Sequence, residues 1–287
     1  MILQEPRKLK EYAVVTAMIT TALLLSACAA LQPPDVSGPR SNLPPYPIIA
    51  NVPDRYEEAS LAWKQLSQNY GLAQDTRGDL QPLTGTLRSV PANLVNSISL
   101  PRVGTGPIPT EEETRESLRR FIVEWRSVIG TDPSQLSLVE RVDDPSGVKI
   151  ARYEQRPFRY PLRGGFGNLV IKFRNDRRLV DISSNCLPNT ERLQSAINGL
   201  TPKVTAETAA TLVKGKSLTV PDATGQQRAF QLSPNDPVNV KQLVAYVMPS
   251  TDQQNLELHL AWEIDVANGP IKTIYLDAVT EQVIAVA

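Results

Sequence analysis

The clearest hydrophobic pattern in the chain has the spacing of a helix and lies between residues 110 and 129. Its apolar residues recur at steps of three and four, which places them on one face of a helix. They are Leu118, Phe121, Ile122, Trp125, Val128 and Ile129. Thr110 and Glu113 have the spacing of a capping box, and Gly130 suits a left-handed C-cap. The pattern predicts an amphipathic helix that begins at Thr110 and ends at Gly130.

A period of two dominates the end of the chain. Over residues 256–266, six apolar residues alternate with Glu257, His259, Ala261, Glu263 and Asp265. This alternation is typical of a strand with one buried and one solvated face. Asn268-Gly269 then predicts a hairpin turn, followed by strands over 271–277 and 282–286.

Weaker patterns complete the prediction of secondary structure. A helix is expected over 54–69, with Ala59, Leu61, Ala62, Leu66 and Tyr70 as inner positions, and another over 205–216. A strand is expected over 83–90, and several strands with turns at 144–147 and 175–176 are expected over 136–187. Helix and then sheet, twice in succession, predicts an α+β fold with antiparallel sheets.

The start of the chain has the layout of a secretory signal. Arg7, Lys8 and Lys10 precede an apolar run over 13–25, which leads through small residues to Cys28. Leu25-Ser26-Ala27-Cys28 resembles a bacterial lipobox. That resemblance implies cleavage after residue 27 and a lipid on the Cys28 sulfur, so we expect an exported protein anchored to the cell membrane or outer membrane. An uncleaved transmembrane helix is the alternative, but the run is shorter than the roughly 20 residues that a bilayer requires.

The charge and cysteine content of the chain limit the classes of partner that it can bind and the disulfides that it can form. Removing residues 1–27 takes three of the 30 basic and two of the 30 acidic residues, which leaves 27 against 28. A nearly neutral chain offers no bulk attraction for nucleic acid. With Cys28 lipidated, Cys186 has no cysteine to pair with, and we expect it to be a half-buried apolar residue at a strand end. The seven prolines between Gln32 and Pro53 predict an extended tether that buries no core.

Residues with catalytic potential are few. His259 is the only histidine, and its place in the alternation predicts a solvated side chain. A zinc hydrolase with an H-E-x-x-H helix needs two histidines, and a serine hydrolase needs a histidine that is oriented toward a nucleophile. We therefore expect no catalytic residue, metal or cofactor. Turns account for the carboxylates at 143–144 and 176–181, and Gly164-Gly165-Phe166-Gly167 predicts a tight connection between strands.

Basic and aromatic residues interleave between Arg152 and Arg178. The basic members are Arg152, Arg156, Arg159, Arg163, Lys172, Arg174, Arg177 and Arg178. On an exported protein they are not expected to bind nucleic acid. An acidic protein or lipid head groups are open alternatives, and a solvated strand face with arginine stems over apolar surface is the favoured interpretation.

Six segments, in order, resemble the propeptides of thermolysin-type and fungalysin-type metalloproteases. The first three are Leu83-Thr84-Gly85-Thr86-Leu87-Arg88, Arg152-Tyr153-Glu154-Gln155 and the hairpin of 169–173 with 178–182. The last three are the alanine-rich 205–218, Leu260-Ala261-Trp262-Glu263-Ile264 and Asp277-Ala278-Val279-Thr280. Pro161-Leu162-Arg163-Gly164-Gly165 lacks the family's G-x-P-V core, and Glu281 replaces its glycine.

The resemblance implies two successive cystatin-like modules without an active site. They would be a fungalysin/thermolysin-propeptide-like module over 54–199 and a PepSY-like module over 200–287, after a signal peptide (1–27) and a tether (28–53). The chain ends at Ala287, where the family's protease would begin, so we expect no protease domain. The resemblance implies a protein-binding lipoprotein that inhibits or chaperones a secreted metalloprotease. A cell-envelope scaffold that binds another protein or surface ligand is the alternative.

Overall fold

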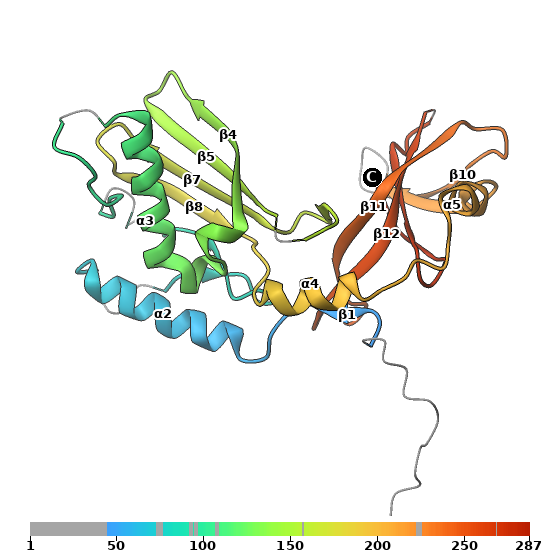
Figure 1. The fold of residues 1–287 in the computed structure, drawn as a ribbon, viewed down its shortest axis with the longest axis horizontal. Helices are drawn as coiled ribbons and strands as arrows, with labels where there is room; N and C mark the ends of the chain where they lie inside the picture. The colour runs from blue at the N-terminus through green and yellow to red at the C-terminus, as the bar shows by residue number, and fades with distance from the viewer. Residues whose placement is uncertain are drawn as a thin grey trace, which may run out of the picture. The chain divides into compact units, whose positions relative to one another are not determined.

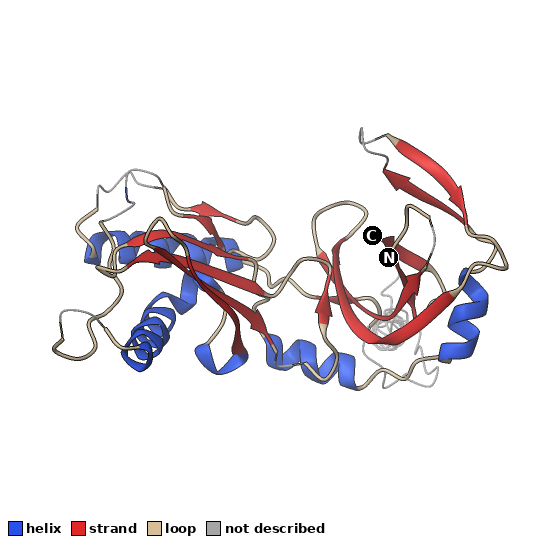
Figure 2. Ribbon diagram, turned by 90° about the horizontal axis from the view of Figure 1, so that it is seen from above, coloured by secondary structure: helices blue, strands red, loops and turns tan. Residues whose placement is uncertain are grey.

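Helices packed against antiparallel sheets make up the fold, which confirms the predicted mixed α+β class (Figures 1 and 2). The structure is a computed structural model, and it describes residues 45–72, 77–91, 94, 97–106, 109–156, 158–221, 226–267 and 269–287. The predicted signal peptide, Cys28, most of the tether and Asn268 lie outside these residues. Within them, no helix combines the length and apolar character needed to span a membrane.

The first sheet has four strands in chain order, each antiparallel to its neighbour. They are β4 (Leu136–Asp143), β5 (Val148–Gln155), β7 (Asn168–Arg174) and β8 (Leu179–Ser184). Helix α3 (Glu111–Ile129, green in Figure 1) packs across one face of this sheet, and α2 (Arg55–Asn69) packs against α3. Short elements complete this part: the hairpin of β2 (Asp79–Leu80) with β3 (Leu87–Ser89), and the 3-10 turn η3 (Pro133–Gln135).

Trp125 lies at the centre of the core between these helices and the sheet. Its ring stacks on Phe121 at 4.8 Å and meets Trp63 and Tyr70 edge-on, at 6.1 and 5.8 Å between centroids. The predicted apolar stripe of α3 is buried as expected. On α2 the prediction is wrong at Leu61, which is 70% exposed, because Trp63 fills the inward position that the pattern assigned to its neighbours.

The ends of α3 have the predicted chemistry. The Thr110 hydroxyl accepts a hydrogen bond from the Glu113 N–H at 3.2 Å, and the Glu113 carboxylate accepts one from the Thr110 N–H at 2.7 Å. Gly130 ends the helix at a φ of 89°, in the left-handed region that residues with a Cβ avoid. Both ends of this helix are therefore determined by local sequence.

Replacing Thr110 with alanine should lower the free energy of unfolding by about 1 kcal/mol, because an N-cap hydroxyl satisfies an otherwise unpaired helix N–H. Urea denaturation followed by circular dichroism measures the change. Thr105→Ala is the matched control, since Thr105 lies in the preceding loop and is exposed. An equal loss in both variants would show that the cap contributes nothing.

The second sheet forms around a long hairpin of β11 (Val238–Pro249) and β12 (Leu256–Val266). Strands β13 (Thr273–Asp277) and β14 (Val283–Val286) extend it antiparallel beyond β12, as the alternation and the turn predict. On the other side, β6 (Leu162–Arg163) pairs with β11 in parallel, which departs from the predicted all-antiparallel arrangement. Sequence analysis did not predict α4 (Thr190–Asn198), β11 or the hairpin of β9 (Ser217–Pro221) with β10 (Gln227–Gln231).

Helix α5 (Ala206–Val213) confirms the predicted third helix, which is shorter than expected. Ala209 and Val213 pack in a core with Leu218 and Ile264. The predicted strand over 83–90 is present only at 87–89. Residues 82–84 form a turn instead, and Gly85 follows at a φ of 62° with the Arg55 carbonyl close to where a Cβ would be. That close approach favours a turn over a continuous strand.

The end of the predicted tether belongs to the folded part. Strand β1 (Ile48–Ile49) pairs antiparallel with β12, and Ile48 and Ala50 are buried. The expectation that residues up to Pro53 bury no core is therefore wrong for this stretch. The apolar Ile48-Ile49-Ala50 has enough hydrophobic surface to add a short strand to the sheet even though prolines precede it.

Candidate functional site

Strand β4 is the free edge of the first sheet. In the described part of the chain it pairs with β5 on one side and with no strand on the other. Leu138, Val139 and Val142 are 37%, 40% and 38% exposed. A β-bulge between Leu138 and Glu140 interrupts its register, a common way to limit uncontrolled pairing at an edge. An edge that exposes backbone groups beside apolar side chains can bind an extended polypeptide.

A groove of about 380 Å³ lies beside this edge, between α3 and β4. Its apolar wall consists of Ile122, Pro133, Leu136, Leu138 and Tyr153. Burial raises the pKa of Tyr153 to about 12, against the opposing effect of nearby arginines, so its hydroxyl stays protonated. That hydroxyl has no hydrogen-bond partner among the described residues, and it can donate to a ligand in the groove.

Arginines Arg115 and Arg119 form the polar wall of the groove. Glu111 is shared by Arg115 and Arg141, at 2.7 and 3.7 Å between nitrogen and oxygen. Glu116 is likewise shared by Arg119 and Arg120, at 2.6 and 2.7 Å. Because two carboxylates serve four guanidinium groups, this side of the groove has more positive than negative charge.

The basic segment from Arg152 to Arg178 does not form one patch. Five of its eight cations have acidic partners within the described residues: Arg152 with Glu140, Arg156 with Glu154, Arg163 with Glu263, Lys172 with Asp181, and Arg178 with Asp176. Arg159 lies over the Tyr160 ring at 5.5 Å. The charges are dispersed and mostly neutralised, in agreement with the favoured interpretation of a strand face.

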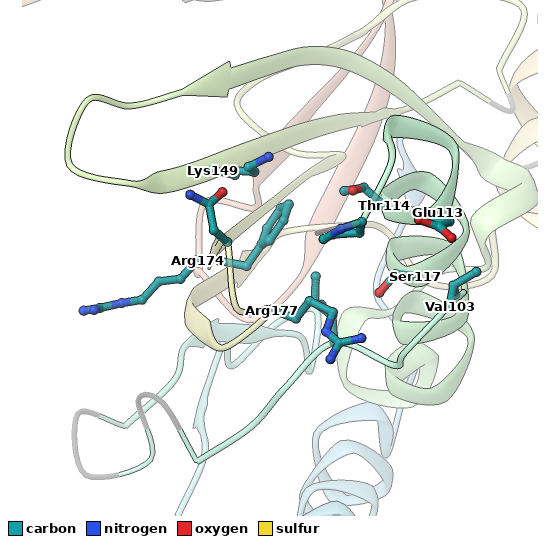
Figure 3. Close-up of a pocket in the computed structure, with 11 residues that line it drawn as sticks. Val103, Glu113, Thr114, Ser117, Lys149, Arg174 and Arg177 are labelled. Carbon is teal, nitrogen blue, oxygen red and sulfur yellow. The ribbon is translucent and has the colours of Figure 1, made fainter. Parts of the chain in front are cut away.

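Arg174 and Arg177 have no ion pair with a described residue, and they line a small pocket beside the first turns of α3 (Figure 3). Lys149 and Glu113 come from other sides, and the Ser117 hydroxyl is already bonded to the Pro101 carbonyl at 2.6 Å. The pocket holds about 20 Å³, which is room for roughly one water molecule. It is too small for an organic anion, so we interpret it as a packing gap.

His259 is the main correction to the sequence prediction. It is only 7% exposed, and its Nδ1 lies 2.7 Å from an Asp277 carboxylate oxygen. Its Nε2 lies 3.3 Å from Glu257, and the Tyr46 ring packs edge-on against it at 5.6 Å. The face of β12 that the alternation predicts to be solvent-exposed is covered here. The Tyr46 side chain, from a residue more than two hundred positions earlier in the chain, packs against it.

Asp277 is the centre of this buried group. The Tyr46 hydroxyl donates to it at 2.6 Å, and the Val279 and Thr280 N–H groups each donate at 2.8 Å. Burial alone would raise the pKa of Asp277, but these hydrogen bonds and that of His259 together outweigh burial and lower it. Burial and the bond to Asp277 raise the pKa of Tyr46 well above its usual range. These bonds join the segment that precedes β1 to strand β12 and to the turn that follows β13.

Glu263 is a second buried carboxylate, and it also lies on the face of β12 that is predicted to be solvent-exposed. Arg163 contacts it with two nitrogens, at 2.8 and 3.3 Å, and Gln242 donates to it at 2.9 Å. Burial would raise the pKa of Glu263, but the bonds from Arg163 and Gln242 keep it lowered. Arg163 also faces a cavity of about 700 Å³ walled by residues 154–156, residues 158–168 and Tyr275. Its guanidinium is committed to Glu263 and so has little capacity left for a ligand there.

The glycines of residues 164–167 form the predicted tight connection. Gly164, Gly165 and Gly167 all have positive φ, and a Cβ at Gly164 would lie 1.8 Å from the Val247 carbonyl oxygen.

Asp144 and Asp176 lie at turns, as expected. The turn prediction is wrong for Asp143, which ends β4, and for Asp181, which lies in β8; each pairs with a lysine of the neighbouring strand. No group of three or more metal-ligating side chains occurs among the described residues.

Cys186 is more buried than predicted. It follows β8, has no exposed surface and belongs to the core around Trp125. Burial raises the pKa of its thiol to about 12, so it is not a reactive thiolate. Cys28, the predicted acyl acceptor, lies outside the described residues.

Sequence reasoning did not identify the free edge. Four of the eight residues of β4 are apolar, but only the strand order reveals that no neighbouring strand covers this edge. A comparison with protein-family models gives no match for this chain, and a comparison with curated protein sequences gives none either. The propeptide resemblance is therefore a prediction from its motifs.

Proposed function

We propose that this protein is a non-catalytic lipoprotein, anchored through Cys28, that binds a secreted metalloprotease and inhibits it or assists its folding. The free edge of β4 carries this proposal. It offers an extended segment of a partner both backbone hydrogen bonds and exposed apolar side chains: Leu138 on the face that carries α3, Val142 on the opposite face and Val139 at the bulge. The order of helix and antiparallel sheet supports two cystatin-like modules, the architecture that the propeptide motifs imply.

The location of the motifs agrees with a role in binding. Tyr153, from the Arg-Tyr-Glu-Gln segment, lines the groove beside β4. Asp277, from the Asp-Ala-Val-Thr segment, holds buried contacts that fix the second sheet. One motif thus contributes to the binding surface, whereas the other stabilises the fold.

Inhibition of a purified thermolysin-type protease by the full chain in detergent micelles tests the proposal. We expect submicromolar inhibition, with the protein surviving uncut. A version that begins at residue 54 is unsuitable, because it would lack β1 and the Tyr46 contact.

Two substitutions locate the contact. Leu138→Asp should weaken inhibition at least about tenfold, because it replaces an exposed apolar side chain of the β4 edge with a charge. Leu61→Asp is the matched control, since Leu61 is an exposed leucine on α2. Absence of inhibition, or equal weakening by both substitutions, would contradict the proposal. Rapid digestion without inhibition would favour the cell-envelope scaffold.

A further inference from the structure

The direction of the β4 backbone groups defines where a partner strand binds. The Asp144 N–H donates to the Val148 carbonyl at 2.8 Å, and the Arg156 N–H donates to the Gln135 carbonyl at 3.0 Å. Residues opposite each other in an antiparallel pair alternate between bonded and non-bonded. From the register, the non-bonded residues on either side of the bulge are Leu136, Leu138, Arg141 and Asp143. Their N–H and C=O groups point away from β5, toward the open edge, although the Leu136 N–H is already bonded to the Pro133 carbonyl.

The side chains of two of these residues lie in the groove. Leu136 and Leu138 line it together with Tyr153, and Arg115 and Arg119 form its other side. A strand bonded to the outward backbone groups would run beside this groove and place alternate side chains over it. The groove is therefore part of the same binding surface as the edge.

The charges on this side of α3 favour an acidic side chain. Arg115 is 64% and Arg119 57% exposed, so both remain accessible to a ligand despite their ion pairs. Asp132 is a third nearby acid, and it faces Arg119 and Arg126. Three carboxylates thus accompany five guanidinium groups. The acids are Glu111, Glu116 and Asp132, and the bases are Arg115, Arg119, Arg120, Arg126 and Arg141.

We infer that the edge of β4 selects an extended, mainly apolar segment that carries a carboxylate over the groove. The carboxylate binds Arg115 and Arg119 and accepts a hydrogen bond from the Tyr153 hydroxyl, while the backbone of the segment pairs with β4. Charge-assisted bonds of this kind are roughly twice as strong as neutral ones, and they fix the register of the added strand. This inference rests on the proposed function, because it names the chemistry of the partner segment at that site.

Two fluorescein-labelled octapeptides test the selection with the full chain in detergent micelles. Both alternate threonine and valine, and they differ only in glutamate or lysine at one central position. Fluorescence anisotropy should show the glutamate peptide binding about tenfold more tightly than the lysine peptide at low salt, with the difference shrinking as salt screens the charges. Equal affinities, or failure of both peptides to bind, would overturn the inference.

Neutral variants connect the preference to the arginines. Arg115→Gln with Arg119→Gln should abolish the preference for glutamate, whereas Arg88→Gln with Arg102→Gln, an exposed pair outside the groove, should preserve it. Circular dichroism melting verifies that each variant is folded. Tyr153→Phe, which keeps the ring, provides a second variant. It should lower the affinity for the glutamate peptide and leave the affinity for the lysine peptide unchanged. An unchanged preference in folded variants would overturn the inference.

The two proposals fail in different ways. Protease inhibition without a preference for the glutamate peptide would leave the proposed function standing and overturn the inference. A glutamate preference that requires Arg115 and Arg119, without inhibition of any protease, would support the inference. It would contradict the proposal that the partner is a protease.

Discussion

Replacing Asp277 with alanine is expected to lower the free energy of unfolding by about 3 to 5 kcal/mol, the range for removing one member of a buried charged network. Asp277 has no exposed surface. Without its carboxylate, the Tyr46 hydroxyl, the His259 ring and the Val279 and Thr280 N–H groups lose their acceptor. Buried donors left unpaired keep their desolvation cost, so the loss exceeds that of a single bond.

Urea denaturation of the full chain in micelles, monitored by tryptophan fluorescence, measures this change. Asp176→Ala is the matched control. Asp176 also accepts a backbone N–H, from Arg178, but it lies in an exposed turn and should cost less than about 1 kcal/mol. Similar losses in the two variants would show that the buried group around Asp277 is not a stabilising centre.

Asp277→Ala should also change how the free energy of unfolding depends on pH in the acidic range. The pKa of Asp277 is lowered in the folded protein, so its stabilising effect is complete above the ordinary aspartate value of about 3.9 and is lost as pH falls through the lower folded value. Stability measured from pH 6 downward should therefore fall less steeply in Asp277→Ala than in the natural protein. Parallel curves would contradict the lowered pKa.

Local chemistry made part of the fold predictable. Helix α3 has its cap, stripe and stop within twenty residues of each other, and the hairpin turn at 144–147 bonds to its own backbone through Asp144. In such elements the residues that fix the structure are neighbours in the sequence. The same periodicities supported the α+β fold class.

Contacts between distant residues explain what the sequence did not reveal. His259 alternates with apolar residues, as a solvated side chain would, but Tyr46 and Asp277 bury it. Glu263 is covered in the same way by Arg163, a hundred residues earlier. Periodicity assigns residues to a face of a strand, but only the tertiary fold determines which faces are covered.

The candidate site was predictable only in its parts. The segment containing Tyr153 was singled out as a motif, and the apolar residues of β4 were within the predicted strand-rich stretch. Edge position is a property of strand order, and the groove requires α3 to cross the sheet at Arg115 and Arg119. Neither property has a signal in one sequence. Arginine density instead suggested the 152–178 segment, where most charges are neutralised in the fold.

Replacing Cys28 with alanine is expected to move nearly all of the protein from the membrane fraction to the soluble fraction. Two or three acyl chains anchor a protein stably, whereas a single chain binds reversibly with a constant of only about 10⁴ M⁻¹. The apolar run over 13–25, the alternative anchor, is shorter than the roughly 20 residues that a bilayer requires. Fractionation of cells followed by immunoblotting, together with labelling by a radioactive fatty acid, measures both location and acylation.

Cys186→Ala is the matched control because it removes the only other cysteine. Cys186 is buried in the core around Trp125, so this variant should be less stable but still labelled and still found with the membrane. If Cys28→Ala lost its label but stayed with the membrane after a high-salt wash, residues 13–25 would act as an uncleaved anchor. Release of Cys28→Ala with retention of Cys186→Ala would instead assign the anchor to Cys28. The edge of β4 that we propose as a binding site would then belong to a protein held at the membrane.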